Sequence, residues 1–207
     1  MKGWKIKKSF WGCGNYPLFQ KLFLKQGLKL ASLGAYALMV DDAILNTRLK
    51  GEKKVGCFCK YCVNGFKNFA SVENKEISDV DVQKLKTAIK NNVETGKSYS
   101  AYTKTLVKLY EKYQQKSVIL FYKNWKMKIK KEFPSIKFLT NNYNGSWNTI
   151  YQQFDGGIAE LQSKYINVKS LDNLYHLADS YNKTQVFTIA TANEAKQFKL
   201  MDYNAKN

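Results

Sequence analysis

The chain has 207 residues, which is long enough for one domain with a substantial core and too short for two ordinary ones. Apolar residues make up 44% of the chain and aromatic residues 14%, a composition that excludes intrinsic disorder. Lysine and arginine total 34 against 16 acidic residues, and the resulting formal net charge of +18 points toward a polyanionic partner such as nucleic acid.

The distribution of the basic residues weakens that nucleic-acid interpretation. Almost all of them are lysines spread along the whole chain, and the single arginine is Arg48, although arginine is the preferred reader of phosphate groups and guanine edges. No stretch approaches the roughly 18 apolar residues of a membrane span. No apolar segment follows the basic N-terminus, so the sequence predicts a cytoplasmic protein without a signal peptide or a membrane partner. An extracellular protein is the alternative if the true N-terminus is missing.

The N-terminal part of the chain predicts a helix followed by a buried strand. Residues 17–33 have an apolar face at helical spacing, with Pro17 suited to the first turn and Gly34 to the end. The continuous apolar run 35–40 is typical of a strand buried on both faces, and it stops at two acidic residues.

Helical patterns dominate the middle of the chain, and strands dominate its C-terminal part. Ser78 is a suitable N-cap for the second of the three middle helices. We expect helices over residues 62–70, 79–94, 98–132 and 170–182, and strands over residues 136–140, 154–159 and 184–190.

Alternating strands and helices indicate a parallel sheet covered by helices. A complete (β/α)8 barrel takes about 250 residues. Because about four strands are visible, we expect residues 1–207 to form a single α/β domain, an incomplete TIM-like (β/α) barrel, with a smaller doubly wound domain as the alternative. Polar residues follow the strands, at the edge where α/β folds build their sites.

The four cysteines of the chain are crowded in a way that favours a metal site. Cys57, Cys59 and Cys62 lie within six residues, and Cys13 precedes the first helix. Four thiolates match a closed tetrahedral Zn²⁺ site, which has no open position for a reacting water. Free or paired thiols are the alternative interpretation.

Three segments around these cysteines resemble barrel-type glycoside hydrolases of bacteria, and family 42 β-galactosidases in particular. They are residues 15–19, 33–42 and 56–66, and the resemblance continues weakly through 133–142 and 154–160. Family 42 enzymes hold zinc with one cysteine followed, after a long gap, by Cys-x-Cys-x-x-Cys. The same order stands here, with 43 residues between the first two cysteines.

The resemblance implies glycoside hydrolysis, which needs two carboxyl groups flanking the scissile bond. The strand before Asp41 and Asp42 corresponds to the fourth barrel strand, whose end usually carries Asn-Glu with Glu as the acid/base. Asp42 is then the candidate acid, although the shorter side chain withdraws the carboxyl, and a loop-capping role is the alternative. Glu160 is the first candidate for the catalytic partner and Glu194 the second, and both also suit a helix N-terminus.

Further polar and aromatic residues are candidates for contacts with a sugar. They are Asp41, Asn141, Asn142, Trp147, Asp155 and Glu194. Trp147 also suits a core position. The single histidine, His176, lies in a predicted helix and supports no hydrolase triad.

Two rival functions stay open beside the glycosidase. One is a carbohydrate-binding protein that has lost its acid, and the other is a zinc-stabilised basic protein that binds nucleic acid or another polyanion. A binder of this second kind gathers its lysines on one face, whereas a glycosidase has an acidic cleft at the strand ends.

Overall fold

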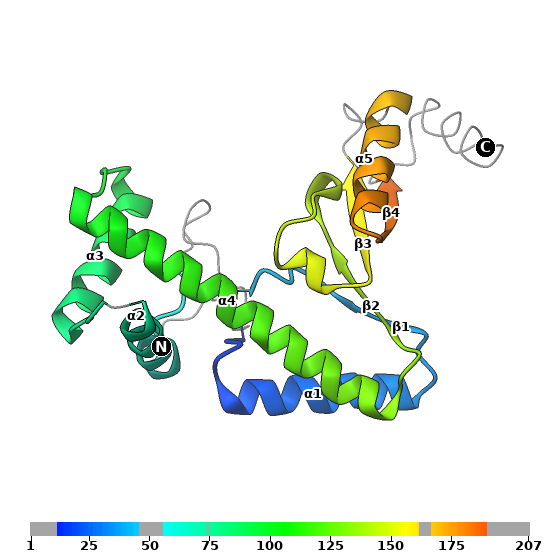
Figure 1. The fold of residues 1–207 in the computed structure, drawn as a ribbon, viewed down its shortest axis with the longest axis horizontal. Coiled ribbons are helices and arrows are strands. Elements are labelled where there is room, and N and C mark those ends of the chain that lie inside the picture. The colour runs from blue at the N-terminus through cyan, green and yellow to red at the C-terminus, as the bar shows by residue number, and fades with distance from the viewer. Residues whose placement is uncertain (1–11, 46–55, 74, 162–166, 190–207) are drawn as a thin grey trace. The chain divides into compact units, whose positions relative to one another are not determined.

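The computed structural model describes residues 12–45, 56–73, 75–161 and 167–189. These ranges contain five α-helices, four β-strands and two short 3₁₀ helices (Figure 1). The helices are α1 (Pro17–Ser32), α2 (Lys60–Val72), α3 (Asp79–Thr95), α4 (Ala101–Glu132) and α5 (Val168–Ser180). The strands are β1 (Ala37–Val40), β2 (Lys137–Asn141), β3 (Gly156–Leu161) and β4 (Thr184–Ile189), and the 3₁₀ helices are η2 (Tyr143–Gly145) and η3 (Tyr151–Gln153).

Every predicted helix and strand is present, with ends displaced by at most three residues. The predicted N-cap of α3 is confirmed: the Ser78 side chain accepts a hydrogen bond from the Asp81 backbone, and the Asp81 carboxylate accepts one from the Ser78 backbone. This reciprocal capping box satisfies two N–H groups that the helix itself leaves unpaired. At its other end, α3 stops at Gly96, whose φ of +69° suits glycine.

The chain divides into two compact units. Unit 1 comprises residues 1–26 and 44–125, and unit 2 comprises residues 27–43 and 126–207. The expected single domain stays a prediction. No described helix is both long and apolar enough to cross a membrane.

Unit 1 has a core built where α2, α3 and α4 meet. Tyr110 of α4 lies at its centre, fully buried, with its ring stacked on Phe58 at 4.7 Å and edge-on to Phe66 at 4.8 Å. Aromatic pairs at these separations add to the free energy gained by apolar burial. The buried members of this core are Phe66, Ala70, Val82, Leu85, Ile89, Leu106, Val107, Leu109, Tyr110 and Tyr113.

Unit 2 is built on a parallel sheet with the strand order β1-β2-β3-β4. The predicted parallel α/β architecture is therefore confirmed. Each strand pairs with the next along the chain and the order does not reverse, whereas a doubly wound sheet has a point of reversal. The described strands form one open sheet, so they do not establish a barrel.

The two faces of this sheet differ in exposure. One face carries buried side chains such as Leu38 and Phe138. On the other face, Met39 is 50% exposed and Val186 is 43% exposed. Met39 pairs with Leu139 and Val186 pairs with Ile158, and the register places all four on this same face. Parallel sheets are normally covered on both sides. In the described residues, the face of Met39 and Val186, which we call the open face, is incompletely covered.

Candidate metal centre and strand-edge residues

The four cysteines come together in unit 1. Their sulfur atoms all lie within 4.8 Å of one another, with Cys13 Sγ 3.4 Å from Cys62 Sγ and 3.8 Å from Cys59 Sγ. A tetrahedral ion with metal–sulfur bonds of about 2.3 Å holds its sulfurs about 3.8 Å apart. A disulfide would require about 2.05 Å, and all four thiols are free. The predicted cluster is thus confirmed as a group that fits a four-coordinate metal ion.

Two local structures position these sulfurs. Cys13 lies in a turn closed by a hydrogen bond of 2.9 Å from the Tyr16 backbone to its carbonyl, just before α1. Cys59 is the N-cap residue of α2, and Cys62 follows in the first turn of that helix. The N-terminus of a helix carries partial positive charge, which stabilises a thiolate. The short spacing of the motif therefore places Cys59 and Cys62 at the N-terminus of α2.

Side chains of α4 and the Cys13 turn surround the sulfurs. The Asn15 amide donates to Cys62 Sγ at 3.3 Å, and it also contacts Tyr113 Oη at 3.3 Å and Ser117 Oγ at 3.2 Å. On the other side, Tyr110 donates to the Cys57 carbonyl, as does the fully buried Gln114 amide at 3.4 Å. Such outer contacts orient metal ligands.

The sequence alone predicts no functional role for these α4 residues. Tyr113, Gln114 and Ser117 lie in a segment whose apolar periodicity predicts only a helix with one buried face. Asn15 lies within the segment that carries the glycosidase resemblance, but its contacts with Tyr113 and Ser117 span 98 and 102 residues. A signal was available in Gln114, because a polar residue on an apolar helix face requires a hydrogen-bond partner.

Hydrogen bonds among the sulfurs shift the pKa values of Cys13, Cys57 and Cys62. The pKa of Cys57 falls to about 2, chiefly because the Cys13 thiol hydrogen-bonds to its thiolate and then because Cys62 does. The pKa of Cys13 rises to about 12, chiefly through the same hydrogen bond with Cys57, and the pKa of Cys62 is raised by its bonds to Cys13 and Cys57. Negative charge is therefore concentrated on the Cys57 sulfur, which accepts hydrogen bonds from the Cys13 and Cys62 thiols. A bound cation takes the place of the remaining thiol protons.

A second group of polar residues lies in unit 2, at the carboxyl ends of β1 and β2. The Asn141 amide donates to the Asp41 carboxylate at 2.6 Å, and its carbonyl oxygen accepts from the Asp42 backbone at 2.7 Å. Asp42 has a φ of +48°, a conformation that costs free energy for a residue with a side chain. The Asn141 side chain thus fixes the turn that carries both aspartates, in which Asp41 is exposed whereas the Oδ1 atom of Asp42 is buried.

Glu160 lies near the carboxyl end of β3 with an exposed side chain. The register aligns Asn141 with Ile158, two residues before Glu160, so Asn141 and Glu160 face the same side of the sheet. That side is the open face. Asp41, Asn141 and Glu160 are therefore associated with one edge of the sheet, as the sequence analysis expected for strand-end residues.

Three other candidates lie in different surroundings. Asn142 is fully buried, and its amide exchanges two hydrogen bonds of 2.9 and 3.0 Å with Gln185. Trp147 is 5% exposed. Asp155 precedes β3, at the amino end of the strand. Its carboxylate accepts from the Phe138 backbone at 2.9 Å.

Lysines of α4 lie near that carboxylate. Lys126 and Lys130 place their Nζ atoms 3.9 and 4.0 Å from it. Burial lowers the pKa of Lys126, and the charge of Asp155 partly opposes this shift. Of the remaining candidates, Glu194 lies outside the described residues, and His176 is exposed on α5, 3.5 Å from Asp172.

Comparison of the chain with protein-family models, with curated proteins and with solved structures returned no match. A function is therefore inferred from the fold, the cysteine cluster and the polar residues at the carboxyl edge of the sheet.

Proposed function

We propose that the four cysteines hold a structural Zn²⁺ ion and that the chain binds and cleaves a glycoside at the carboxyl edge of its sheet. Four sulfur ligands complete the tetrahedral coordination that zinc prefers, which leaves no position for substrate or water. The metal would therefore stabilise unit 1 and take no part in the reaction. Zinc also suits thiolate ligands without introducing redox chemistry.

The sheet topology supports a partial (β/α) barrel of the glycosidase type. In such barrels each parallel strand lies beside the next one along the chain, which is the order β1-β2-β3-β4. The metal cluster draws three of its ligands from the segment after β1, as the family 42 resemblance implies. The open face of the sheet would correspond to the interior of the barrel.

The observation that carries the glycosidase proposal is the Asn141 side chain, which holds Asp41 and the Asp42 backbone at the same sheet edge as Glu160. β1 and β3 are separated by two strand spacings, roughly 10 Å between backbones. Paired glycosidase carboxyl groups lie roughly 5–9.5 Å apart. Backbones at this spacing are compatible with such a separation between the carboxyl groups of Asp42 and Glu160.

In this mechanism Asp42 donates a proton to the leaving oxygen of the glycosidic bond. As that bond breaks, a new bond to the anomeric carbon forms on the other side of the sugar, either from the Glu160 carboxylate or from a water whose proton Glu160 accepts. Asp41 and Asn141 bind hydroxyl groups. Asn142, Trp147 and Asp155 stay candidates for sugar contacts. Asn142 and Trp147 are buried, Asn142 hydrogen-bonds to the Gln185 side chain, and the Asp155 carboxylate accepts from the Phe138 backbone.

The test uses the full chain and p-nitrophenyl β-D-galactopyranoside, followed by p-nitrophenolate release. We expect slow turnover that falls by about 10²–10⁴-fold in Asp42→Asn and in Glu160→Gln. Asp179→Asn, an exposed aspartate on α5, is the matched control and should retain wild-type turnover.

Calorimetric titration of the protein with galactose measures binding separately from catalysis. Binding without turnover, weakened by Asn141→Ala, would reduce the proposal to a carbohydrate-binding protein. Neither turnover nor binding would refute the carbohydrate site. The zinc proposal is tested separately by elemental analysis, in which one zinc per chain with four protected thiols is expected.

A further inference from the structure

The positive charge of the chain is concentrated in one of its two units. Unit 1 contains 22 of the 34 lysine and arginine residues but only seven of the 16 acidic residues. Unit 2 contains nearly balanced numbers, 12 basic and nine acidic. The lysines that look evenly spread in the sequence are therefore unevenly divided in the fold. A partner attracted by charge would be drawn to unit 1.

Within unit 1, α4 arranges its lysines on one side. Lys104, Lys108, Lys112 and Lys116 recur every four residues, and Lys123 follows. At about 100° per residue these five side chains fall within a sector of about 120°. All five are exposed, and we call this surface the α4 lysine face. It extends for about 28 Å along the helix, from the rise of about 1.5 Å per residue.

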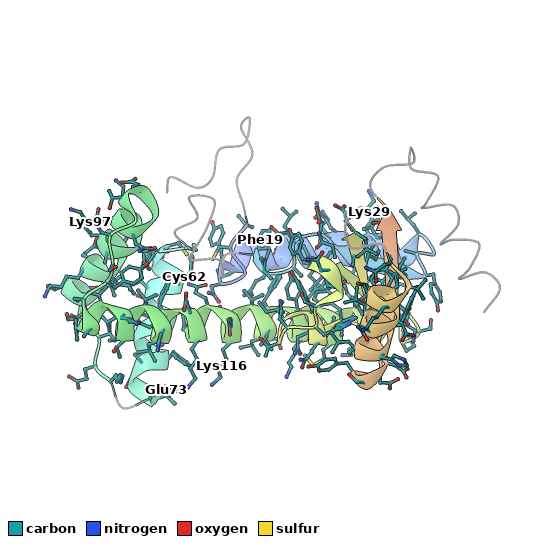
Figure 2. The ribbon with its side chains drawn as sticks, turned by 90° about the horizontal axis from the view of Figure 1, so that it is seen from above. Phe19, Lys29, Cys62, Glu73, Lys97 and Lys116 are labelled. Atoms are coloured by element: carbon teal, nitrogen blue, oxygen red, sulfur yellow. The ribbon has the colours of Figure 1, made fainter. Side chains whose placement is uncertain are left out.

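Contacts with α2 hold the middle of the α4 lysine face in place. The Nζ atoms of Lys112 and Lys116 lie 5.8 and 5.3 Å from the centre of the Phe69 ring. Lys112 also pairs with Glu73 at 2.8 Å. In Figure 2, Glu73 and Lys116 lie on the same side of α4, and Cys62 lies on the other side. The α4 lysine face is thus separate from the cysteine cluster.

We propose that the α4 lysine face binds the phosphodiester backbone of a nucleic-acid duplex. A straight row of ammonium groups on a rigid helix matches a stiff linear polyanion, which in duplex DNA carries one charge per about 1.7 Å of axis. The residues between the lysines include Thr105 and Gln115, both exposed and polar. The large exposed apolar side chains of α4, Tyr102, Leu120 and Met127, lie about 20–40° outside the sector of the five lysines, whereas a helix face that inserts into a membrane would carry such side chains within it.

Lysine contacts to phosphates carry little sequence information, so this binding should be independent of base sequence and steeply dependent on salt. Glu111, which is half-buried, borders the face, and Glu73 neutralises part of it. Removing the Glu73 charge should therefore strengthen binding. This inference is independent of the carbohydrate site, which lies in unit 2.

The experiment measures binding of a fluorescein-labelled 20-base-pair DNA duplex to the full chain by anisotropy, across a series of salt concentrations. The test variant carries Lys108→Gln and Lys116→Gln. The control carries Lys128→Gln and Lys131→Gln, which makes the same change in charge at exposed positions of the same helix outside the α4 lysine face.

We expect the test variant to bind about tenfold or more weakly and its salt slope to shrink by roughly two, since each lost phosphate contact removes about 0.9. The control should bind as the wild type does. Glu73→Gln should bind more tightly, whereas Asp172→Asn on α5 should not. Equal weakening by both lysine pairs would overturn the proposal, because the effect would then follow net charge. Tighter binding to phosphatidylserine vesicles than to the duplex would also overturn it.

Discussion

The Asn15 side chain connects the cysteine centre to α4. Its amide donates to Cys62 Sγ and lies within hydrogen-bond distance of Tyr113 and Ser117. Hydrogen bonds to a metal-bound sulfur stabilise the thiolate and fix the direction of its lone pairs. Loss of this amide should therefore weaken metal binding without removing a ligand.

We expect Asn15→Ala to lower zinc affinity by about 10–100-fold. Competition with a chromophoric chelator at pH 7 measures the change. Asn167→Ala is the matched control, because Asn167 caps α5 in unit 2 through a hydrogen bond to Ser170, and its loss should leave zinc affinity unchanged. An unchanged affinity in Asn15→Ala would show that the amide is a packing contact only.

The surroundings of individual polar residues could not be predicted from the sequence unless their partners were local. The Cys-x-Cys-x-x-Cys spacing located the metal cluster because its ligands are local. Asn142 follows a strand just as Asn141 does, yet its partner Gln185 is 43 residues away and both are buried. Asp155 pairs with the Phe138 backbone of the neighbouring strand. No local pattern distinguishes these long-range partners from exposed strand-end residues.

At the scale of elements, α3 depends on its N-terminal capping box. The pKa of Asp81 is lowered, first by the hydrogen bond from the Ser78 side chain and then by that from Tyr102. A carboxyl with a lower pKa in the folded state binds fewer protons there than in the unfolded chain. Its contribution to stability is therefore present above the unfolded pKa and disappears as the pH falls through the folded pKa.

We expect Asp81→Asn to lower Tm at pH 6, and the difference from the wild type to shrink below about pH 4, where the wild-type carboxyl becomes protonated. Thermal unfolding followed by circular dichroism at a series of pH values measures it. Glu76→Gln, an exposed acid just before the helix, serves as the control. A Tm difference that stays constant down to pH 2 would contradict the role of the charge.

Elements were predictable where their signals were local. Ser78, Gly34 and Pro17 stand at or beside helix ends as expected, and the continuous apolar run before Asp41 became β1. Strand order and the division into two units depend on contacts between distant segments, which no periodicity encodes. The uneven charge of the two units became visible only once that division was known.

At the scale of the whole molecule, the cysteine centre belongs to unit 1, and the sheet belongs to unit 2 with its own buried side chains. Metal binding to such a site contributes directly to the free energy of folding. Removal of the metal should therefore affect the two units unequally.

We expect chelation of the proposed zinc ion to increase amide hydrogen exchange in α2 and α3, while amides of β2 and β3 remain protected. Exchange measured by mass spectrometry on peptides from each unit checks this, and added zinc should restore the original protection. A uniform increase along the chain would show that the two units unfold together.

β1 lies between two of the four cysteines in the sequence, so a metal bound to all four would also restrict the unfolded chain around this strand. Cys13 and Cys57 are separated by 43 residues, and this segment contains both α1 and β1. Cross-linking the ends of a loop of this length restricts the unfolded chain by about 4 kcal/mol in a chain-entropy description. A bound metal would therefore restrict the unfolded chain around α1 and β1, although β2 lies outside the closed loop, 100 residues along the chain from its partners in β1. The ion would thus lower the conformational entropy of the unfolded segment that supplies the first strand of the sheet.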